Sequence, residues 1–182
     1  MGNIYNDTNV LYSGIFMSSE EMNDLLTKIK PSTDRLPVAI KTPHVVLAKG
    51  VAGLMTDMIG QYVKIIVKGY GRTDNCEALL VDLVADDEKL NKELFRLSEN
   101  RFFTINISVT KDPEITPANQ WELLRNAMET EGIYGVCLKD NDLNYGSRVL
   151  INNVEDASRT SHKIKDVEKW GGEKEYVVDI NV

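Results

Sequence analysis

The residues best suited to chemistry lie on two predicted strands that are far apart in the chain. His44 follows a proline in a short apolar run. Because side chains alternate along a strand, His44 should lie on the face opposite Val45 and Leu47, which point into the core. A histidine can transfer a proton near neutral pH, whereas Thr, Asn and Ser can donate hydrogen bonds to a phosphate oxygen. The second strand, residues 103–109, alternates polar and apolar positions, and its polar face carries Thr104, Asn106 and Ser108.

The strand predicted over residues 61–70 offers a second set of polar side chains. Its alternation sends valine and isoleucine toward the core and puts Tyr62, Lys64 and Tyr70 on the opposite face. Tyr62 and Lys64 could therefore add an aromatic and a cationic contact to a ligand surface. The alternative for Lys64 is a solvated charge on an exposed sheet, and the sequence leaves both interpretations open.

Three helices are predicted from capping residues and from apolar positions spaced by three or four, over residues 18–30, 86–99 and 117–131. The first opens with a capping box, in which Ser18 stands three positions before Glu21. The apolar face and the stop signal expected for the third helix are Trp121, Leu124, Met128 and Gly132.

The predicted strands lie before, between and after these helices. Their ranges are 11–16, 38–47, 61–70, 77–84, 102–110, 134–138, 148–154 and 176–182. This order favours an α+β fold built on an antiparallel sheet. We expect one core over residues 1–132 and a β-rich extension, residues 133–182, packed on the same domain.

The composition limits the classes of function. The chain has 182 residues, 42 % of them hydrophobic, and a net charge of −7, which favours one folded domain. A long duplex usually meets a basic stripe, so we expect a small nucleotide or an RNA end rather than long nucleic acid. No run approaches the about 18–20 apolar residues of a membrane span, so we expect no membrane partner. The N-terminal residues lack the pattern of a signal peptide, so we expect a cytoplasmic protein.

The sequence indicates no metal site and no cofactor. Cys76 and Cys137 are far apart and show no metal-ligand spacing, so we expect two reduced, partly buried thiols. Residues 140–144 (DNDLN) resemble the start of a calcium loop, but Ile151 stands where the closing glutamate is needed, so we expect a turn. No glycine-rich phosphate loop is present in the sequence.

These motifs resemble those of the two-histidine (2H) phosphoesterases. That family carries two motifs, each a histidine followed two positions later by Thr or Ser, on the inner strands of two pseudo-symmetric lobes. Residues 43–47 (PHVVL) resemble the first motif, and residues 103–109 (FTINISV) resemble the strand that holds the second. The similarity spans roughly residues 10–124 and is greatest to the cyclic phosphodiesterase domains of fungal-type tRNA ligases.

The resemblance implies a two-lobed, 2H-like antiparallel sheet with flanking helices and one concave cleft, in which His44 faces Thr104, Asn106 and Ser108. In the family, one histidine is the general base and the other the general acid across a phosphodiester. Here Thr104 stands at the second histidine position, and Val46 replaces the hydroxyl residue of the first motif. Threonine is no proton donor near neutral pH, but its hydroxyl still donates a hydrogen bond.

The resemblance therefore predicts a protein that binds a nucleotide, a cyclic (oligo)nucleotide or an RNA-end phosphodiester and cuts it poorly. Some phage 2H proteins destroy cyclic-nucleotide immune signals, so a non-cutting relative could sequester such a signal in the host cytoplasm and evade anti-phage defence. The alternative is an active, metal-independent phosphodiesterase in which His44 works with a replacement acid. His162, expected at the surface, could supply that acid only if the C-terminal part folds over the cleft. A purely structural or protein-binding domain is the third possibility, and the oligomeric state stays open.

Overall fold

The computed structural model describes residues 10–29, 35–39, 43–110, 121–139, 146–150 and 175–179. Strands and helices follow one another in an order close to the predicted one, with a short 3₁₀ turn, η1, between β3 and β4. The elements are β1 (Val10–Phe16), α1 (Ser19–Ile29), β2 (Val38–Ala39), β3 (His44–Lys49), η1 (Thr56–Met58), β4 (Tyr62–Arg72), β5 (Cys76–Ala85), α2 (Glu88–Ser98), β6 (Phe103–Val109), β7 (Glu122–Lys139), β8 (Gly146–Leu150) and β9 (Glu175–Asp179).

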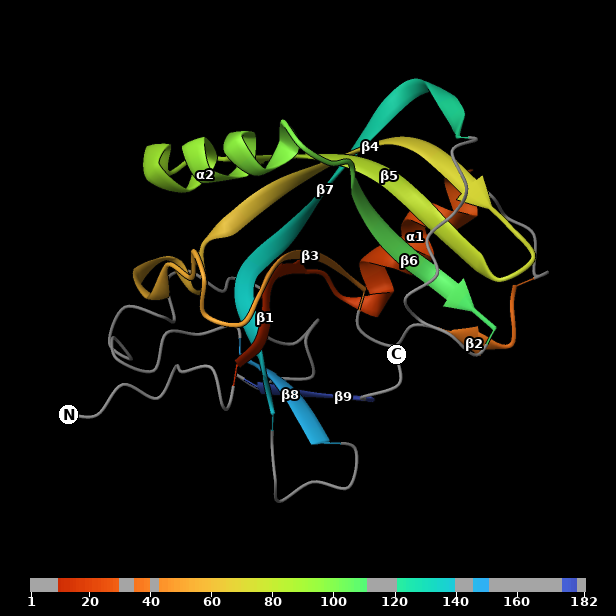
Figure 1. Cartoon of the computed structure of the whole chain (residues 1–182). Helices are drawn as coiled ribbons and strands as arrows, with labels where there is room; N and C mark the ends of the chain where they lie inside the picture. Colours follow the sequence, from red (N-terminus) through yellow and green to blue (C-terminus); the bar gives the residue numbers. More distant parts are fainter. Residues whose placement is uncertain are drawn as a thin grey trace.

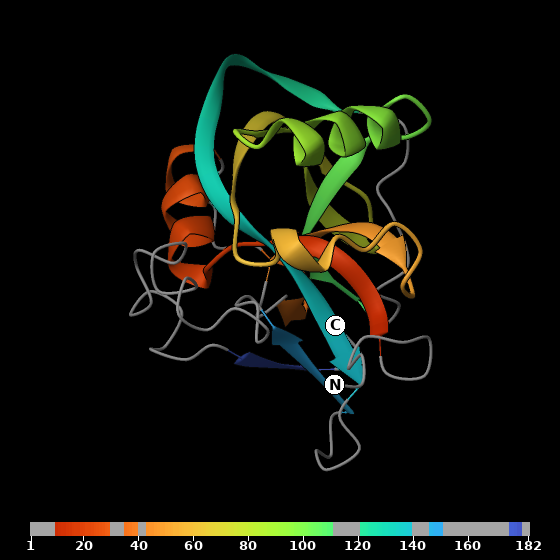
Figure 2. The ribbon, with the colours of Figure 1, turned by 90° about the vertical axis from the view of Figure 1, so that its left-hand side faces the viewer.

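All the strands described belong to one antiparallel sheet, which confirms the α+β class. The central six strands follow the order β6-β5-β4-β7-β1-β3 and curl into a nearly closed barrel (Figure 1). β2 extends the sheet beyond β6, while β8 pairs with the far part of β7 and β9 pairs with β8. Figure 2 shows the long β7 bending around the barrel, so that it pairs with β4 and then with β1.

The barrel closes where β3 lies against β6. Arg101, two residues before β6, donates a hydrogen bond to the carbonyl oxygen of Leu47 on β3. The interior is filled by apolar side chains from all six strands, as the alternation predicts for Val45 and Leu47. Its buried members include Ile15, Val45, Leu47, Val63, Ile65, Val67, Leu79, Val81, Ile105 and Val136.

Two of the predicted helices are confirmed, together with their capping chemistry. At the start of α1 the Ser18 hydroxyl accepts a hydrogen bond from the amide of Glu21 at 3.2 Å. At the start of α2 the Asp87 carboxylate accepts one from the amide of Leu90 at 2.9 Å. Each helix buries an apolar face in the barrel core. Within the described ranges, no helix has the length and apolar character needed to cross a membrane.

The helices lie at opposite ends of the barrel. α1 packs against Pro43, just before β3, and against the end of β6; we name this the α1 end. α2 lies at the other end of β3, beside Leu47 and Ala48; we name this the α2 end. A six-stranded barrel is narrower than the eight-stranded kind that side chains just fill, so its interior leaves no room for a ligand.

The predicted helix over residues 117–131 is wrong. Residues 111–120 lie outside the described part, and the chain from Glu122 onward is the strand β7. Leu124 and Met128 do pack on the core, but a spacing of four also puts two side chains on one face of a strand. The segment pairs with β4, which lies far away in the chain, and this pairing makes it a strand rather than a helix.

β7 also runs through the boundary expected at residue 132. Residues 134–138, predicted as a strand of the C-terminal extension, are part of β7 and lie in the barrel next to β1. The strands predicted over 148–154 and 176–182 overlap β8 and β9 within the described residues. The expected turn at 140–144 and His162 lie outside those residues.

Gly132, interpreted from the sequence as a helix stop, is a mid-strand glycine required by close packing. A Cβ placed there would lie 2.6 Å from Cγ2 of Ile15 and 2.9 Å from both Cδ1 of Ile65 and the carbonyl oxygen of Phe16. Real side chains do not approach so closely. The absence of a side chain therefore lets β1 and β4 pack across β7.

Replacing Gly132 by alanine should lower the free energy of unfolding by about 1–3 kcal/mol, because the added methyl group overpacks the core. The matched control is Gly69→Ala on β4, where the nearest atoms would be 3.3–3.5 Å from the new Cβ. Chemical denaturation of both variants measures the difference. Equal stability of the two variants would show that the packing around Gly132 yields without cost.

Candidate functional site

His44 begins β3 on the outer face of the barrel, where it is half-buried. Its ring stacks on Tyr12, with ring centroids 5.2 Å apart, and lies at an angle to Phe16, at 5.6 Å. The Tyr12 hydroxyl and His44 Nε2 share a hydrogen bond at 3.1 Å. Burial, and then the neighbouring thiol of Cys137, raise the pKa of Tyr12 above its ordinary value, so that this phenol keeps its proton. The imidazole is thus held by two aromatic neighbours.

The prediction that Thr104, Asn106 and Ser108 share one polar face of β6 is only partly correct. Thr104 and Asn106 lie half-buried on the outer face, opposite Leu80 and Ala78 of β5. The register then shifts, because Ile107 is an extra residue between the pairs formed by Asn106 and Ser108. This β-bulge turns Ser108 to the other face, where it is fully buried. Ser108 therefore does not share a surface with Thr104 and Asn106, as strict alternation predicted.

A second bulge changes the face of Tyr70 in the same way. On β4, Lys68 is the extra residue between the pairs formed by Val67 and Gly69 with β5. Tyr70 consequently points into the barrel and is buried, contrary to the prediction that it shares the face of Tyr62 and Lys64.

The other two candidate ligand residues on β4 lie elsewhere. Tyr62 is half-buried, and the exposed Lys64 lies 3.8 Å from the Glu129 carboxylate. In the sheet, β5 separates β4 from β6, while β7 and β1 separate β4 from β3. The structure therefore does not bring Tyr62 and Lys64 to His44 or to the polar residues of β6.

The two bulges create a buried polar cluster around Glu77, which is 0 % exposed. The Ser108 hydroxyl donates to its Oε1 at 2.9 Å, and the Tyr70 hydroxyl donates to its Oε2. The guanidinium groups of Arg35 and Arg72 lie 2.8 and 3.8 Å from Oε2. We name Glu77, Tyr70, Ser108, Arg35 and Arg72 the Glu77 cluster. A carboxylate removed from water requires this kind of compensation.

Burial and the Glu77 carboxylate alter the pKa values of Tyr70 and Cys76. Burial, and then the hydrogen bond to Glu77, raise the pKa of Tyr70 to about 12. Burial, followed by the negative charge of Glu77, raises the pKa of the Cys76 thiol to about 11. Cys76 therefore stays a thiol near neutral pH, and it is fully buried where a partly buried thiol was expected.

Sequence reasoning missed Glu77 and Arg35. Glu77 was visible as the single carboxylate at the start of a buried apolar strand, and such a charge requires a partner. Arg35 gave no such signal, because it lies in a polar, proline-bounded segment and reaches Glu77 from 42 positions away.

A cavity of about 110 Å³ lies at the α1 end, between α1, the start of β3 and the end of β6. It brings Ser108 and Arg35 together with Pro43, the residue that precedes His44. Neither the His44 side chain nor Thr104 lines this cavity. Its lining residues are Ser19, Met22, Asn23, Leu26, Arg35, Pro43, Ile107 and Ser108.

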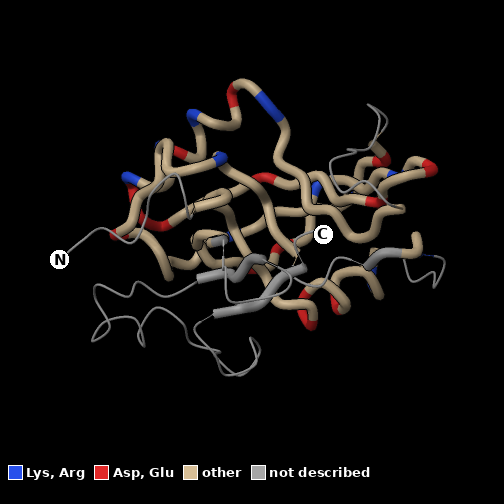
Figure 3. Tube along the Cα trace, turned by 60° about the horizontal axis from the view of Figure 1, so that its bottom comes forward, with Lys and Arg blue, Asp and Glu red and all other residues tan. Residues whose placement is uncertain are grey.

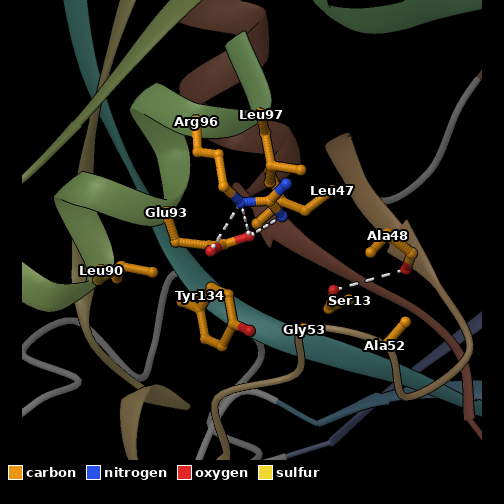
Figure 4. A pocket seen from close by; sticks show the side chains of 10 residues that line it. All are labelled: Ser13, Leu47, Ala48, Ala52, Gly53, Leu90, Glu93, Arg96, Leu97 and Tyr134. Atoms are coloured by element: carbon orange, nitrogen blue, oxygen red, sulfur yellow. Dashed lines mark hydrogen bonds and ion pairs between the residues drawn. The ribbon is translucent and has the colours of Figure 1, made fainter. Parts of the chain in front are cut away.

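A second cavity, of about 160 Å³, lies at the α2 end. Figure 4 shows Glu93 and Arg96 projecting from α2 toward the strands that carry Ser13 and Tyr134. None of the residues predicted from the sequence as site residues lines it.

The charges of the described chain do not gather by sign. Figure 3 shows basic and acidic positions interspersed along the described part of the trace. Among the same residues, no group of three or more His, Cys, Asp or Glu side chains is arranged to hold a metal ion.

Comparison with known proteins gives no match: no family model, no curated protein and no solved structure is detectably similar to this chain. The function must therefore be argued from the geometry of its own residues.

Replacing Glu77 by glutamine should lower the free energy of unfolding by about 3–5 kcal/mol, because it removes the buried charge that the guanidinium groups of Arg35 and Arg72 face. The matched control is Glu129→Gln, which removes one half of an exposed ion pair and should change stability by no more than about 1 kcal/mol. Urea denaturation of both variants measures the effect. Similar values for the two would mean that the Glu77 cluster adds nothing beyond a surface contact.

The pKa of Tyr70 predicts a specific loss of stability at alkaline pH. Because the folded-state pKa, about 12, lies above the ordinary value of 10.0, the folded protein binds this proton more tightly than the unfolded chain. The associated stability is present below pH 10 and is lost as the pH rises toward 12. Tyr70→Phe should make the free energy of unfolding fall less steeply in that window, as measured by denaturation at a series of pH values. Parallel curves for the two proteins would contradict the assignment.

Proposed function

We propose that this protein binds a small phosphodiester ligand, a nucleotide, a cyclic (oligo)nucleotide or an RNA end, at the α1 end of the barrel. The observation that carries the proposal is the convergence of Arg35, Ser108 and the residue preceding His44 on one cavity. A guanidinium group has five donors in a planar fork, so it can bind a carboxylate and a phosphate oxygen together. Here Glu77 holds Arg35 in place before any ligand arrives.

The size of the cavity indicates how such a ligand would sit. Sites that enclose a whole small molecule have volumes of about 300–1,000 Å³, whereas this cavity measures about 110 Å³. Only a compact group such as the phosphate would enter it. The sugar and the base would lie over the outer surface beside His44 and Tyr12.

The two-lobed layout of the 2H phosphoesterases belongs to the same proposal. In that layout the two motif-bearing strands are neighbours, and β3 and β6 support this because they lie against each other at the closure of the barrel. The bulge at Ile107 changes which β6 residue faces the ligand, from Thr104 to Ser108. Because Ser108 donates its one hydroxyl proton to Glu77, its part would be to hold Glu77 and so Arg35, and the hydrogen bonds to a phosphate would come from the Arg35 guanidinium.

The environment of His44 favours binding over cleavage. General acid–base catalysis needs two proton-transfer groups whose pKa values lie near the working pH. His44 Nε2 is engaged with Tyr12, whose raised pKa makes it a poor acid near neutrality. Loss of one partner of an acid–base pair typically lowers the rate by about 10²–10⁴-fold, so any hydrolysis should be slow. Sequestration of a cyclic-nucleotide signal, as in evasion of anti-phage defence, needs only the binding step.

A screen of cyclic and linear nucleotides tests the proposal when thermal stabilisation and product formation are measured on the same samples. We expect at least one ligand to raise the melting temperature without appreciable product. His44→Ala should reduce this stabilisation, because the substitution removes the imidazole beside the cavity and with it the hydrogen bond that Tyr12 shares with His44. Lys92→Ala is the control, since Lys92 is exposed on α2 at the other end of the barrel and should bind as the unmodified protein does.

Two outcomes would contradict the binding proposal. Rapid turnover of a cyclic nucleotide, abolished by His44→Ala, would establish the alternative function, an active phosphodiesterase. Stabilisation by no phosphodiester at all would leave a structural or protein-binding role.

A further inference from the structure

The ring of His44 belongs to a cluster of three aromatic rings on the outer face of β1 and β3. Phe16 stands opposite His44 in the register of these strands, and the Tyr12 ring stacks on the imidazole with 21° between the two planes. The Tyr12 and Phe16 rings also stack, with centroids 6.1 Å apart, and Phe16 is fully buried. This packing limits the rotation of the imidazole and keeps Nε2 beside the Tyr12 hydroxyl, 3.1 Å away.

Cys137 also lies beside the Tyr12 hydroxyl. It stands directly opposite Tyr12 where β1 pairs with β7, it is 1 % exposed, and its thiol is within hydrogen-bond reach of the phenol. The Tyr12 hydroxyl therefore lies between an imidazole nitrogen and a buried thiol. Because a phenol has one proton to donate, it can donate to only one of these two neighbours.

Two arrangements of the protons satisfy this geometry. In the first, Tyr12 donates to Nε2 of His44 and the thiol of Cys137 donates to the phenol oxygen. In the second, Nε2–H donates to the phenol oxygen and the phenol donates to the sulfur. The first is favoured, because a thiol sulfur is a weak acceptor whereas a neutral imidazole has a nitrogen that accepts well. The raised pKa of Tyr12 agrees with it, since the phenol keeps the proton that it donates.

We propose that Tyr12 is a positioning residue that holds neutral His44 in its Nδ1–H form, with the lone pair of Nε2 directed at the phenol. In a neutral imidazole one nitrogen is a donor and the other an acceptor, and the hydrogen bond at one nitrogen decides where the proton lies. Since Nε2 accepts from Tyr12, the proton is on Nδ1.

This assignment decides what His44 can offer a ligand, a consequence that rests on the proposed phosphodiester function. A general base must have its lone pair within reach of the proton that it removes, and the lone pair of His44 is already engaged with Tyr12. The Nδ1–H group can donate to an oxygen or a ring nitrogen of a sugar or base that lies over the outer surface. His44 is therefore a hydrogen-bond donor for binding and not a base for cleavage.

The test is the tautomer of His44 in the full chain without ligand. Long-range proton–nitrogen NMR spectra, recorded at about pH 9 where an ordinary imidazole is neutral, distinguish the protonated ring nitrogen from the unprotonated one. The chain has two histidines, so His162→Gln assigns the remaining signals to His44. We expect the Nδ1–H form to exceed the Nε2–H form by at least about fivefold, the effect of one ordinary net hydrogen bond.

Tyr12→Phe keeps the stacked ring but removes the hydroxyl. The Nε2–H form, which free histidine prefers in water, should then rise by at least about fivefold relative to the Nδ1–H form. Cys137→Ala removes the acceptor that the second arrangement requires, so the Nδ1–H form should stay in excess. Tyr62→Phe is the matched control, because it makes the same change on β4, which β7 and β1 separate from β3. It should leave the tautomer of His44 unchanged.

Two results would overturn the proposal. One is an excess of the Nε2–H form in the unmodified protein, because Tyr12 would then accept from His44. The other is an unchanged ratio of tautomers in Tyr12→Phe that thermal unfolding shows to be folded, since a merely structural role would change the melting temperature and not the ratio. The measurement uses no ligand, so an excess of the Nδ1–H form supports the assignment even if the nucleotide screen refutes the proposed function.

Discussion

The α1 end of the barrel depends on one buried carboxylate. Glu77 is fully buried on β5, and an ion of this kind loses several kcal/mol of hydration when it leaves water. Two hydroxyl groups and two guanidinium groups compensate for this loss, and they come from three parts of the chain: the segment before β2, β4 and β6. The position of the segment that carries Arg35 and the inward turns of β4 and β6 all follow from the need to satisfy this single charge.

The compensation works only because the sheet is irregular at two points. Without the extra residues Lys68 and Ile107, alternation would send Tyr70 and Ser108 to the outer surface. The segment before β2 gains its anchor from the same arrangement, since the amide of Leu36 donates to the Ser108 hydroxyl at 3.1 Å. The polar residues at this end of the barrel are thus held from within, so the cavity beside them has a fixed wall.

Local patterns in the sequence predicted most of the elements but not the surfaces they form. Capping residues located α1 and α2, and alternation located β4 and β6 along with the buried positions that precede each bulge, because both signals act over a few neighbouring residues. A bulge leaves no such signal: Lys68 and Ile107 each stand in a segment whose alternation looks unbroken. The same limit applies to β7, where the spacing of Leu124 and Met128 suits a helix and a strand equally. Only pairing with β4 separates the two, and that pairing is not local.

The sequence indicated which strands meet at the candidate site but not which side chains they place there. The resemblance predicted that the strands carrying His44 and Thr104 lie together, and β3 and β6 do lie against each other. The residues of these strands that line the cavity are nevertheless Ser108 of β6 and Pro43, which precedes β3, rather than Thr104 and the half-buried His44. A barrel of six strands has no room for a ligand inside, so recognition must occur at an end or on the outside. At the α1 end, Glu77 orients the guanidinium group of Arg35, while the imidazole nearby is engaged with a tyrosine that keeps its proton. The proposal of capture rather than turnover depends on this difference: among the described residues at this end, an oriented cation could hold an anion, whereas proton transfer would require the histidine and the tyrosine to leave their mutual hydrogen bond.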